Sequence, residues 1–110
     1  MRQIVIDELS PMERDNIDSY LKRSLKQASM AGLYWIEIPP DLLNAQQMEH
    51  KDCAPYTLGV EVDKQSVRFE LLVRSKSNLH CECIGYASAA QRQFVLDFID
   101  TMLAKEQIRA

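Results

Sequence analysis

Three cysteines and two histidines carry the most distinctive chemistry of this chain. Cys81 and Cys83 lie two residues apart with His80 directly before them, and His50 and Cys53 lie three residues apart further upstream. Thiolate sulfur and imidazole nitrogen are donors that tetrahedral zinc prefers in proteins. The spacing therefore predicts a candidate metal site in which two ligand pairs from separate segments hold one ion, with the ligand set His50, Cys53, Cys81 and Cys83.

The same cysteines have a simpler interpretation, because free cysteine commonly packs as a small hydrophobic side chain. On a regular strand, Cys81 and Cys83 point to one face, and their Cβ atoms are about 6.5–7 Å apart. This alternation places both thiols in the core beside Leu71 and Val73 and leaves His80 on the opposite face. Packing is the interpretation that the sequence favours, and zinc is the alternative.

Two further hypotheses treat the thiols as reactive groups. A disulfide between Cys81 and Cys83 requires local distortion, because residues i and i+2 of an extended strand exceed the usual disulfide geometry. A nucleophilic Cys53 with His50 as its base requires an oxyanion site, which the sequence does not mark. A thiol enzyme centred on Cys53 is therefore the third hypothesis, after a binding module and a zinc-stabilised domain.

Length and composition limit the possible protein classes. Residues 1–110 are enough for one hydrophobic core, and the hydrophobic fraction of 46% is typical of a globular domain. The net charge of −3 opposes nonspecific binding to nucleic acids or anionic lipids, which reward clustered Lys and Arg. The apolar run at residues 4–6 is too short for a signal peptide or a membrane span. We expect a single-domain cytoplasmic protein without nucleic-acid or membrane partners.

Two capping boxes mark the starts of long helices. In each, a serine is followed three residues later by Glu or Gln, so that the two side chains can satisfy each other's backbone amides. They predict helices over about residues 11–29 and 88–106, and Gly32 is the predicted terminator of the first. The two boxes are Ser10 with Glu13 and Ser88 with Gln91.

Alternating apolar residues predict a three-stranded meander in the second half of the chain, because successive strand side chains point to opposite faces. An aromatic and β-branched run predicts a fourth strand. We also expect a short helix within residues 41–49 and an edge strand within residues 2–6. The fold class is therefore α+β, a two-layer sandwich with both long helices on one face of an antiparallel sheet of about four strands. The four strands cover about residues 33–38, 56–62, 67–73 and 79–86.

The pairing of opposite charges and the placement of apolar residues on one face of the sheet predict the register of the two hairpins. Opposite charges favour the pairing of the first hairpin, and a three-residue loop in the second keeps the apolar residues on one face. The predicted pairs are Val60–Phe69 and Glu61–Arg68 in the first hairpin, and Arg74–His80 and Leu71–Cys83 in the second.

A small apolar patch is expected on the otherwise polar face of the sheet. Leu72, Ile84 and Tyr86 fall on that face, with Arg74 and His80 around them. An apolar centre with a charged rim is typical of protein interfaces. The leading functional hypothesis is therefore a non-catalytic protein-interaction or regulatory module that binds a partner protein or a second copy of itself, without a cofactor.

Two other features have both a structural and a functional interpretation. Trp35 suits a ligand groove, although a strand tryptophan more often packs in a core, and the core is our prediction. Lys22, Arg23 and Lys26 form a basic cluster that suits an acidic partner. Nearby carboxylates such as Asp18 offer local ion pairing, so a solvated helix face is the prediction.

One segment is similar to part of a known family. The run CIGYASAAQRQFVLDFID, residues 83–100, resembles the closing strand and helix of PilZ domains and covers less than a fifth of the chain. The paired-arginine motif with which those domains bind a cyclic dinucleotide is absent from this sequence. The resemblance therefore implies no function and no site residues.

Overall fold

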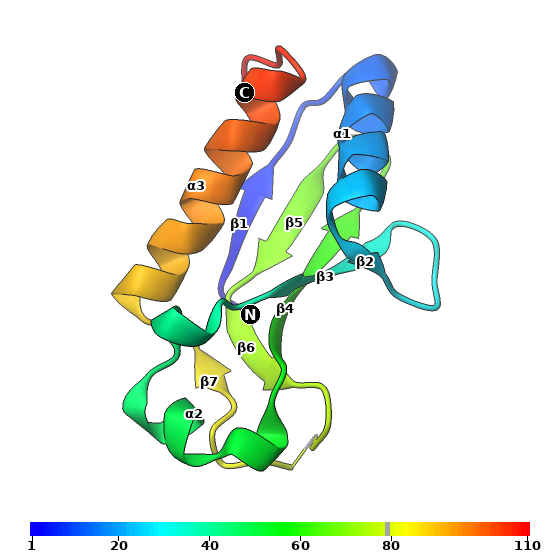
Figure 1. Ribbon diagram of the computed structural model, residues 1–110. Helices are drawn as coiled ribbons and strands as arrows, with labels where there is room; N and C mark the ends of the chain where they lie inside the picture. Colours follow the sequence, from blue (N-terminus) through cyan, green and yellow to red (C-terminus); the bar gives the residue numbers. More distant parts are fainter. Residues whose placement is uncertain (79) are drawn as a thin grey trace.

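The computed structural model describes residues 1–78 and 80–110. Helices and strands alternate irregularly along the chain, and the two long helices lie near its two ends (Figure 1). The elements are β1 (Gln3–Ile6), α1 (Pro11–Ser24), β2 (Lys26–Gln27), β3 (Leu33–Glu37), η1 (Pro40–Leu42), α2 (Ala45–Glu49), η2 (Lys51–Cys53), β4 (Tyr56–Val62), β5 (Val67–Glu70), β6 (Leu72–Ser75), β7 (Gly85–Tyr86) and α3 (Ala89–Lys105).

All strand pairings of the sheet are antiparallel, and its main order is β1-β5-β4-β3-β2. The α+β class and the antiparallel sheet are therefore confirmed. The first hairpin has the predicted register, with Val60 opposite Phe69 and Glu61 opposite Arg68. The expected edge strand within residues 2–6 is β1. The described residues contain seven strands rather than about four, because short strands extend the edges and the β5–β6 strand is interrupted.

The interruption lies at Leu71, between β5 and β6. Three steps along β4, from Val60 to Thr57, correspond to five steps on the facing side, from Phe69 to Arg74, so two residues are extra there. The amide of Leu71 donates to Arg2 O at 3.0 Å, and its carbonyl accepts from Ala87 N at 2.8 Å. Leu71 therefore bonds to neighbouring segments instead of to β4.

The predicted second hairpin is wrong. Residues 80–84 form turns, and the short strand β7 pairs Leu72 with Tyr86 and Val73 with Gly85. The predicted pairs Arg74–His80 and Leu71–Cys83 are not formed, because β7 consists only of Gly85 and Tyr86 and pairs with β6 in a different register. The alternation of apolar residues between His80 and Tyr86 reflects burial within a turn rather than a strand.

Both long helices contact each other over the face of the sheet that carries Phe69. The Phe98 ring of α3 lies 6.0 Å from Tyr20 of α1 and 6.3 Å from Phe69 of β5. Helix α3 matches its prediction closely, whereas α1 ends at Ser24 instead of near residue 29. The chain becomes extended at Leu25 because the next two residues pair with β3 as β2.

Gly32 does not end a helix, as was predicted, but occupies the turn between β2 and β3. Its φ is +79°, a conformation that L side chains rarely adopt. Its carbonyl accepts from Val62 N at 2.8 Å, which fixes the turn to the end of β4.

A glutamine pair connects α3 to the short helix α2. Helix α2 begins after Asn44, and both helices have capping boxes whose third residue is a glutamine, Gln47 in α2 and Gln91 in α3. The two buried amides meet, with Gln91 Nε2 donating to Gln47 Oε1 at 2.9 Å and to Leu42 O at 3.0 Å. The α2 segment is thereby fixed to the start of α3. Within the described residues, no helix is long and apolar enough to cross a membrane.

Candidate functional site

The three cysteines of the chain converge at one end of the molecule. Cys53 ends η2, and Cys81 and Cys83 lie in the turns between β6 and β7. Their sulfurs all lie within 4.8 Å of one another, and the three side chains are buried. We call these three residues the thiol cluster. The predicted burial of Cys81 and Cys83 is confirmed, although a turn rather than a strand produces it.

Cys81 and Cys83 form a disulfide, and Cys53 is a free thiol. The expectation that this pair is too far apart assumed an extended strand. In the turn the two Cα atoms are 5.3 Å apart, within the usual range for a disulfide. The structure therefore brings a thiol and a disulfide together in one buried cluster.

Each sulfur of the thiol cluster accepts a hydrogen bond. The Asn78 side-chain amide donates to Cys53 Sγ at 3.9 Å, and the Cys83 backbone amide donates to Cys81 Sγ at 3.4 Å. The Tyr56 hydroxyl lies 3.3 Å from Cys83 Sγ and shares its single proton between this sulfur and neighbouring carbonyl oxygens. Burial, followed by the neighbouring Cys53 sulfur, raises the pKa of Tyr56 above 10.0, so this hydroxyl keeps its proton at neutral pH. Donors of this kind favour electron-rich sulfur.

Neither histidine belongs to the group formed by the three cysteine sulfurs, which lie within 4.8 Å of one another. His50 immediately precedes η2, and its Nδ1 lies 2.7 Å from the Gln46 carbonyl, an arrangement in which Nδ1 carries the proton and Nε2 has the free lone pair. The backbone carbonyl of His50 accepts from the Tyr56 hydroxyl at 2.8 Å. His80 is exposed. The structure thus joins three of the four predicted metal ligands and leaves His50 beside them.

The thiol-enzyme hypothesis finds little geometric support. Only 5% of Cys53 is exposed, and its sulfur accepts a hydrogen bond from the side-chain amide of Asn78. The ring of His50 is bonded to the Gln46 carbonyl. A substrate would reach this thiol only after the surrounding turns had opened.

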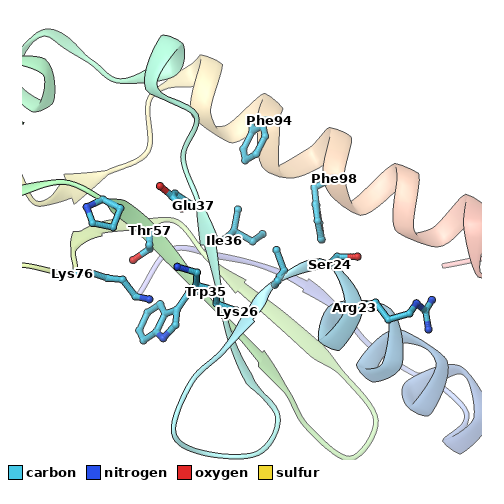
Figure 2. A pocket seen from close by; sticks show the side chains of 12 residues that line it. Arg23, Ser24, Lys26, Trp35, Ile36, Glu37, Thr57, Lys76, Phe94 and Phe98 are labelled. Carbon is cyan, nitrogen blue, oxygen red and sulfur yellow. The ribbon is translucent and has the colours of Figure 1, made fainter.

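A groove of about 560 Å³ lies beside β3, on the side where β2 ends. Figure 2 shows Phe94 and Phe98 of α3 pointing toward Ile36 on one side of the strand, and Trp35 on the other side. Trp35 is half-buried in this groove, so the prediction that it packs in the core is wrong. Successive side chains of β3 point to opposite faces, so Tyr34 points into the core and Trp35 lies on the other face.

The groove is rimmed by more cations than anions. Arg23, Lys26 and Lys76 line it, with Glu37 as the only carboxylate among the lining residues that the structure describes. The ammonium of Lys76 lies 5.9 Å from the centre of the Trp35 ring. Two of these cations belong to the basic cluster predicted from the sequence. Lys76 was missed, because only the tertiary structure places it beside β3.

Two buried polar atoms next to the groove have no hydrogen-bond partner among the described residues. They are Thr57 Oγ1, in the groove lining, and Nε of Arg74, the residue directly opposite Thr57 across the β4–β6 pair. Thr57 is 2% exposed. Most buried polar atoms in native proteins are satisfied, so this unpartnered pair beside the groove is unusual.

The predicted apolar patch is only partly assembled. Leu72 is half-buried opposite Tyr86, which is 41% exposed, and Ile84 is half-buried in the preceding turn. The guanidinium of Arg2 lies 4.4 Å from the centre of the Tyr86 ring. The N-terminal segment therefore covers part of the patch. Arg74 turns toward Glu70, at 3.9 Å, and His80 is exposed.

Comparison of the chain with models of known families, with curated protein sequences and with solved structures gave no match. Functional inference for this protein therefore depends on the residues and their geometry.

Proposed function

We propose that this protein is a non-catalytic interaction module that binds an extended acidic segment of a partner protein in the groove beside β3. The observation that carries the proposal is the coincidence of an apolar groove with an unpaired strand edge. Strand addition at such an edge is a recurring mode of peptide recognition, in which the main chain supplies hydrogen bonds and the side-chain pockets supply specificity.

The free edge begins where β2 stops. Lys26 pairs with Trp35, and the chain before Lys26 turns away into α1. On the same edge Leu33 O accepts from Ala28 N at 2.8 Å. Because backbone groups of alternate residues face the same neighbour in an antiparallel ladder, the N–H and C=O of Glu37 face this open edge too. An added strand would therefore continue β2 along β3.

The two sides of the edge suit alternate residues of an extended peptide. Apolar side chains fit toward Ile36, Phe94 and Phe98, and acidic side chains fit toward Lys26 and Lys76 on the other side. Successive residues of a strand point to opposite faces, so a sequence that alternates acidic and apolar residues matches both. The excess of cations favours a partner of negative charge and speeds its association.

The unpartnered atoms of Thr57 and Arg74 support the same occupant. A carboxylate accepts hydrogen bonds from both a hydroxyl and a guanidinium N–H. An acidic side chain on the outer face would satisfy Thr57 Oγ1 and Arg74 Nε together once a movement of the Arg74 side chain exposes these two atoms.

Trp35 provides a direct test, because it is the only tryptophan of the chain and lines the groove. The fluorescence of Trp35 is titrated with a capped peptide of alternating Glu and Val and, separately, with a capped peptide of alternating Lys and Val. We expect a saturable change with the acidic peptide alone. Equal responses to both peptides, or no response to either, would contradict the proposal.

Matched variants locate the binding. Lys76→Glu reverses a rim charge and should weaken binding of the acidic peptide by about five-fold or more, whereas Lys64→Glu makes the same charge change in the β4–β5 turn and should leave binding unchanged.

A second pair of variants tests the strand edge. Glu37→Pro removes the N–H that faces the edge and should weaken binding more than Glu37→Ala. Sedimentation of the free protein tests for self-pairing, and we expect a monomer. A dimer that Glu37→Pro dissociates would replace the peptide as occupant and refute the proposal.

A further inference from the structure

The thiol cluster lies in a part of the molecule that consists of short elements. Around it are η2, α2, β7 and the turns at residues 80–84, at the end of the molecule away from α1 (Figure 1). Cys53 and Cys81 are 28 positions apart in the chain, yet their sulfurs are within 4.8 Å. Segments that cannot bury a large core of their own are commonly joined by disulfides or structural metal ions.

The sulfur atoms span the size of one coordination sphere. Zinc–sulfur bonds of about 2.3 Å in a tetrahedron place sulfur atoms about 3.8 Å apart. The three sulfurs of the cluster all lie within 4.8 Å of one another, and all three side chains are buried. The Cys81 and Cys83 sulfurs are bonded to each other in this structure, so after reduction they must move apart to share an ion with Cys53.

The surroundings of the sulfurs suit thiolates as well as thiols. Each sulfur accepts one hydrogen bond, from Asn78 Nδ2, the Cys83 amide or the Tyr56 hydroxyl. Outer hydrogen bonds of this type orient metal ligands and adjust their charge. A cluster assembled only by apolar packing does not require a separate donor for each sulfur.

The hydrogen bond of His50 Nδ1 is of the kind that ligating histidines make. Ligating histidines almost always donate their second ring N–H to a carbonyl, a carboxylate or water, which fixes the tautomer. Nδ1 of His50 lies 2.7 Å from the Gln46 carbonyl, so Nε2 is left as the free donor atom. The Tyr56 hydroxyl, which bonds both His50 O and Cys83 Sγ, holds this residue next to the cluster.

From these observations we infer that the reduced protein binds one zinc ion through Cys53, Cys81 and Cys83, with Nε2 of His50 as the fourth donor. Three S–Zn bonds and one N–Zn bond form, the water molecules bound to the aqueous ion leave, and the protons of the three thiols pass to solvent, with no change of oxidation state. The ion joins η2 to the turns before β7. A movement of the His50 side chain toward the sulfurs completes the site.

Metal binding and the Cys81–Cys83 disulfide exclude each other, because a sulfur in a disulfide is not available as a thiolate. The protein is therefore studied after reduction with a phosphine. The phosphine and one water molecule convert the S–S bond to two thiols, and the phosphine becomes its oxide. Oxidation of the pair should release the ion.

The direct test uses the full-length wild-type chain. Reduced protein is loaded with zinc, separated from free metal and subjected to elemental analysis, and cobalt(II) is then used as a spectroscopic probe. We expect one metal ion per chain, with sulfur-to-cobalt charge-transfer absorption and tetrahedral ligand-field bands. Reduced protein that retains no metal, or that gives a cobalt spectrum without sulfur ligation, would overturn the inference.

Variants assign the ligands. Cys81→Ser should lower zinc affinity by more than about 100-fold, and His50→Ala by about 10- to 100-fold, as measured by competition with a chromogenic chelator. His80→Ala is the matched control, because it removes an exposed imidazole next to Cys81, and it should leave affinity unchanged. A large effect of His80→Ala with none of His50→Ala would refute the fourth ligand. If a cysteine variant fails to fold, protection of the wild-type thiols from alkylation by zinc still decides whether the sulfurs are ligands.

Discussion

The molecule has two regions that are stabilised in different ways. In the first, α1 and α3 contact a sheet face formed by β1, β3, β4 and β5, with fully buried side chains such as Phe69, Ile17 and Val95. In the second, α2, η2, β7 and the adjoining turns surround the thiol cluster. The first region depends mainly on apolar burial, whereas the second combines buried residues such as Cys53 and Tyr56 with specific polar contacts between short segments.

Serine side chains illustrate the polar contacts of the second region. The hydroxyl of Ser75 donates to the Cys53 carbonyl and accepts from the backbone N–H of Asn78 at 3.0 Å. The Ser77 hydroxyl donates to Asp52 O at 2.8 Å. Because such bonds are worth about 1 kcal/mol each, whereas a buried aromatic ring contributes several, the second region should open more easily than the first.

The largest expected effect is in the first region. Phe69→Ala should destabilise the protein by about 3–5 kcal/mol in urea unfolding, because it leaves a cavity where Phe69 meets Phe98. Val5→Ala, a truncation at a side chain that is 45% exposed, is the control and should change stability by less than about 0.5 kcal/mol. Similar effects of the two changes would show that the Phe69 face is not the main core.

The next effect is a loss of stability at high pH. Burial, followed by the 2.6 Å hydrogen bond to Asp18 Oδ1, raises the pKa of Tyr34 from 10.0 to about 12. The unfolded chain loses this proton first, so the contribution of Tyr34, up to about 3 kcal/mol, is complete below pH 10 and is lost between pH 10 and 12. Unfolding across this range should show a smaller decline in Tyr34→Phe than in the wild type. An equal decline in both proteins would contradict the assignment.

A smaller and local effect is expected in the second region. Tyr56→Phe removes a buried hydroxyl whose single proton is shared among Gln47 O, His50 O and Cys83 Sγ, at a cost of about 1–2 kcal/mol. Amide hydrogen exchange should accelerate around the thiol cluster and remain slow in α3. Uniform acceleration throughout the chain would show that the two regions unfold as one cooperative unit.

The smallest effect is expected on the exposed face of the sheet. Arg68 lies 2.8 Å from Glu61 and 3.4 Å from Asp63, and both carboxylates are exposed. Arg68→Ala should lower stability only slightly, and the difference from wild type should shrink as salt is added. A large salt-independent loss would mean that packing of the Arg68 stem, rather than charge, stabilises this face.

The two regions also differ in how well the sequence predicts them. Strong local signals, such as the Ser88–Gln91 capping box and the opposite charges of Glu61 and Arg68, correctly predicted α3 and the first hairpin. The prediction of the second hairpin failed because the alternation of apolar residues in this part of the sequence is compatible both with a strand and with a turn that buries its cysteines. Periodicity does not distinguish them over so short a segment.

The candidate sites divide in the same way. The sequence identified three sulfur donors and a nearby histidine by residue type, and it identified the basic cluster at the end of α1. It gave no sign that Lys76 lies beside Trp35, or that Thr57 and Arg74 face each other with unpaired polar atoms. These relationships depend on the two extra residues at Leu71, which no local pattern predicted.

The sequence by itself determined the α+β class, both capped helices, the register of β4 with β5 and the burial of the cysteines, because these follow from local periodicity, capping and charge. The tertiary structure decided where α1 ends, which edge of β3 stays open, and that Cys53 meets Cys81 and Cys83. The physical reason is that these outcomes depend on pairing between segments far apart in the chain, where a shift of one or two residues changes which side chains meet.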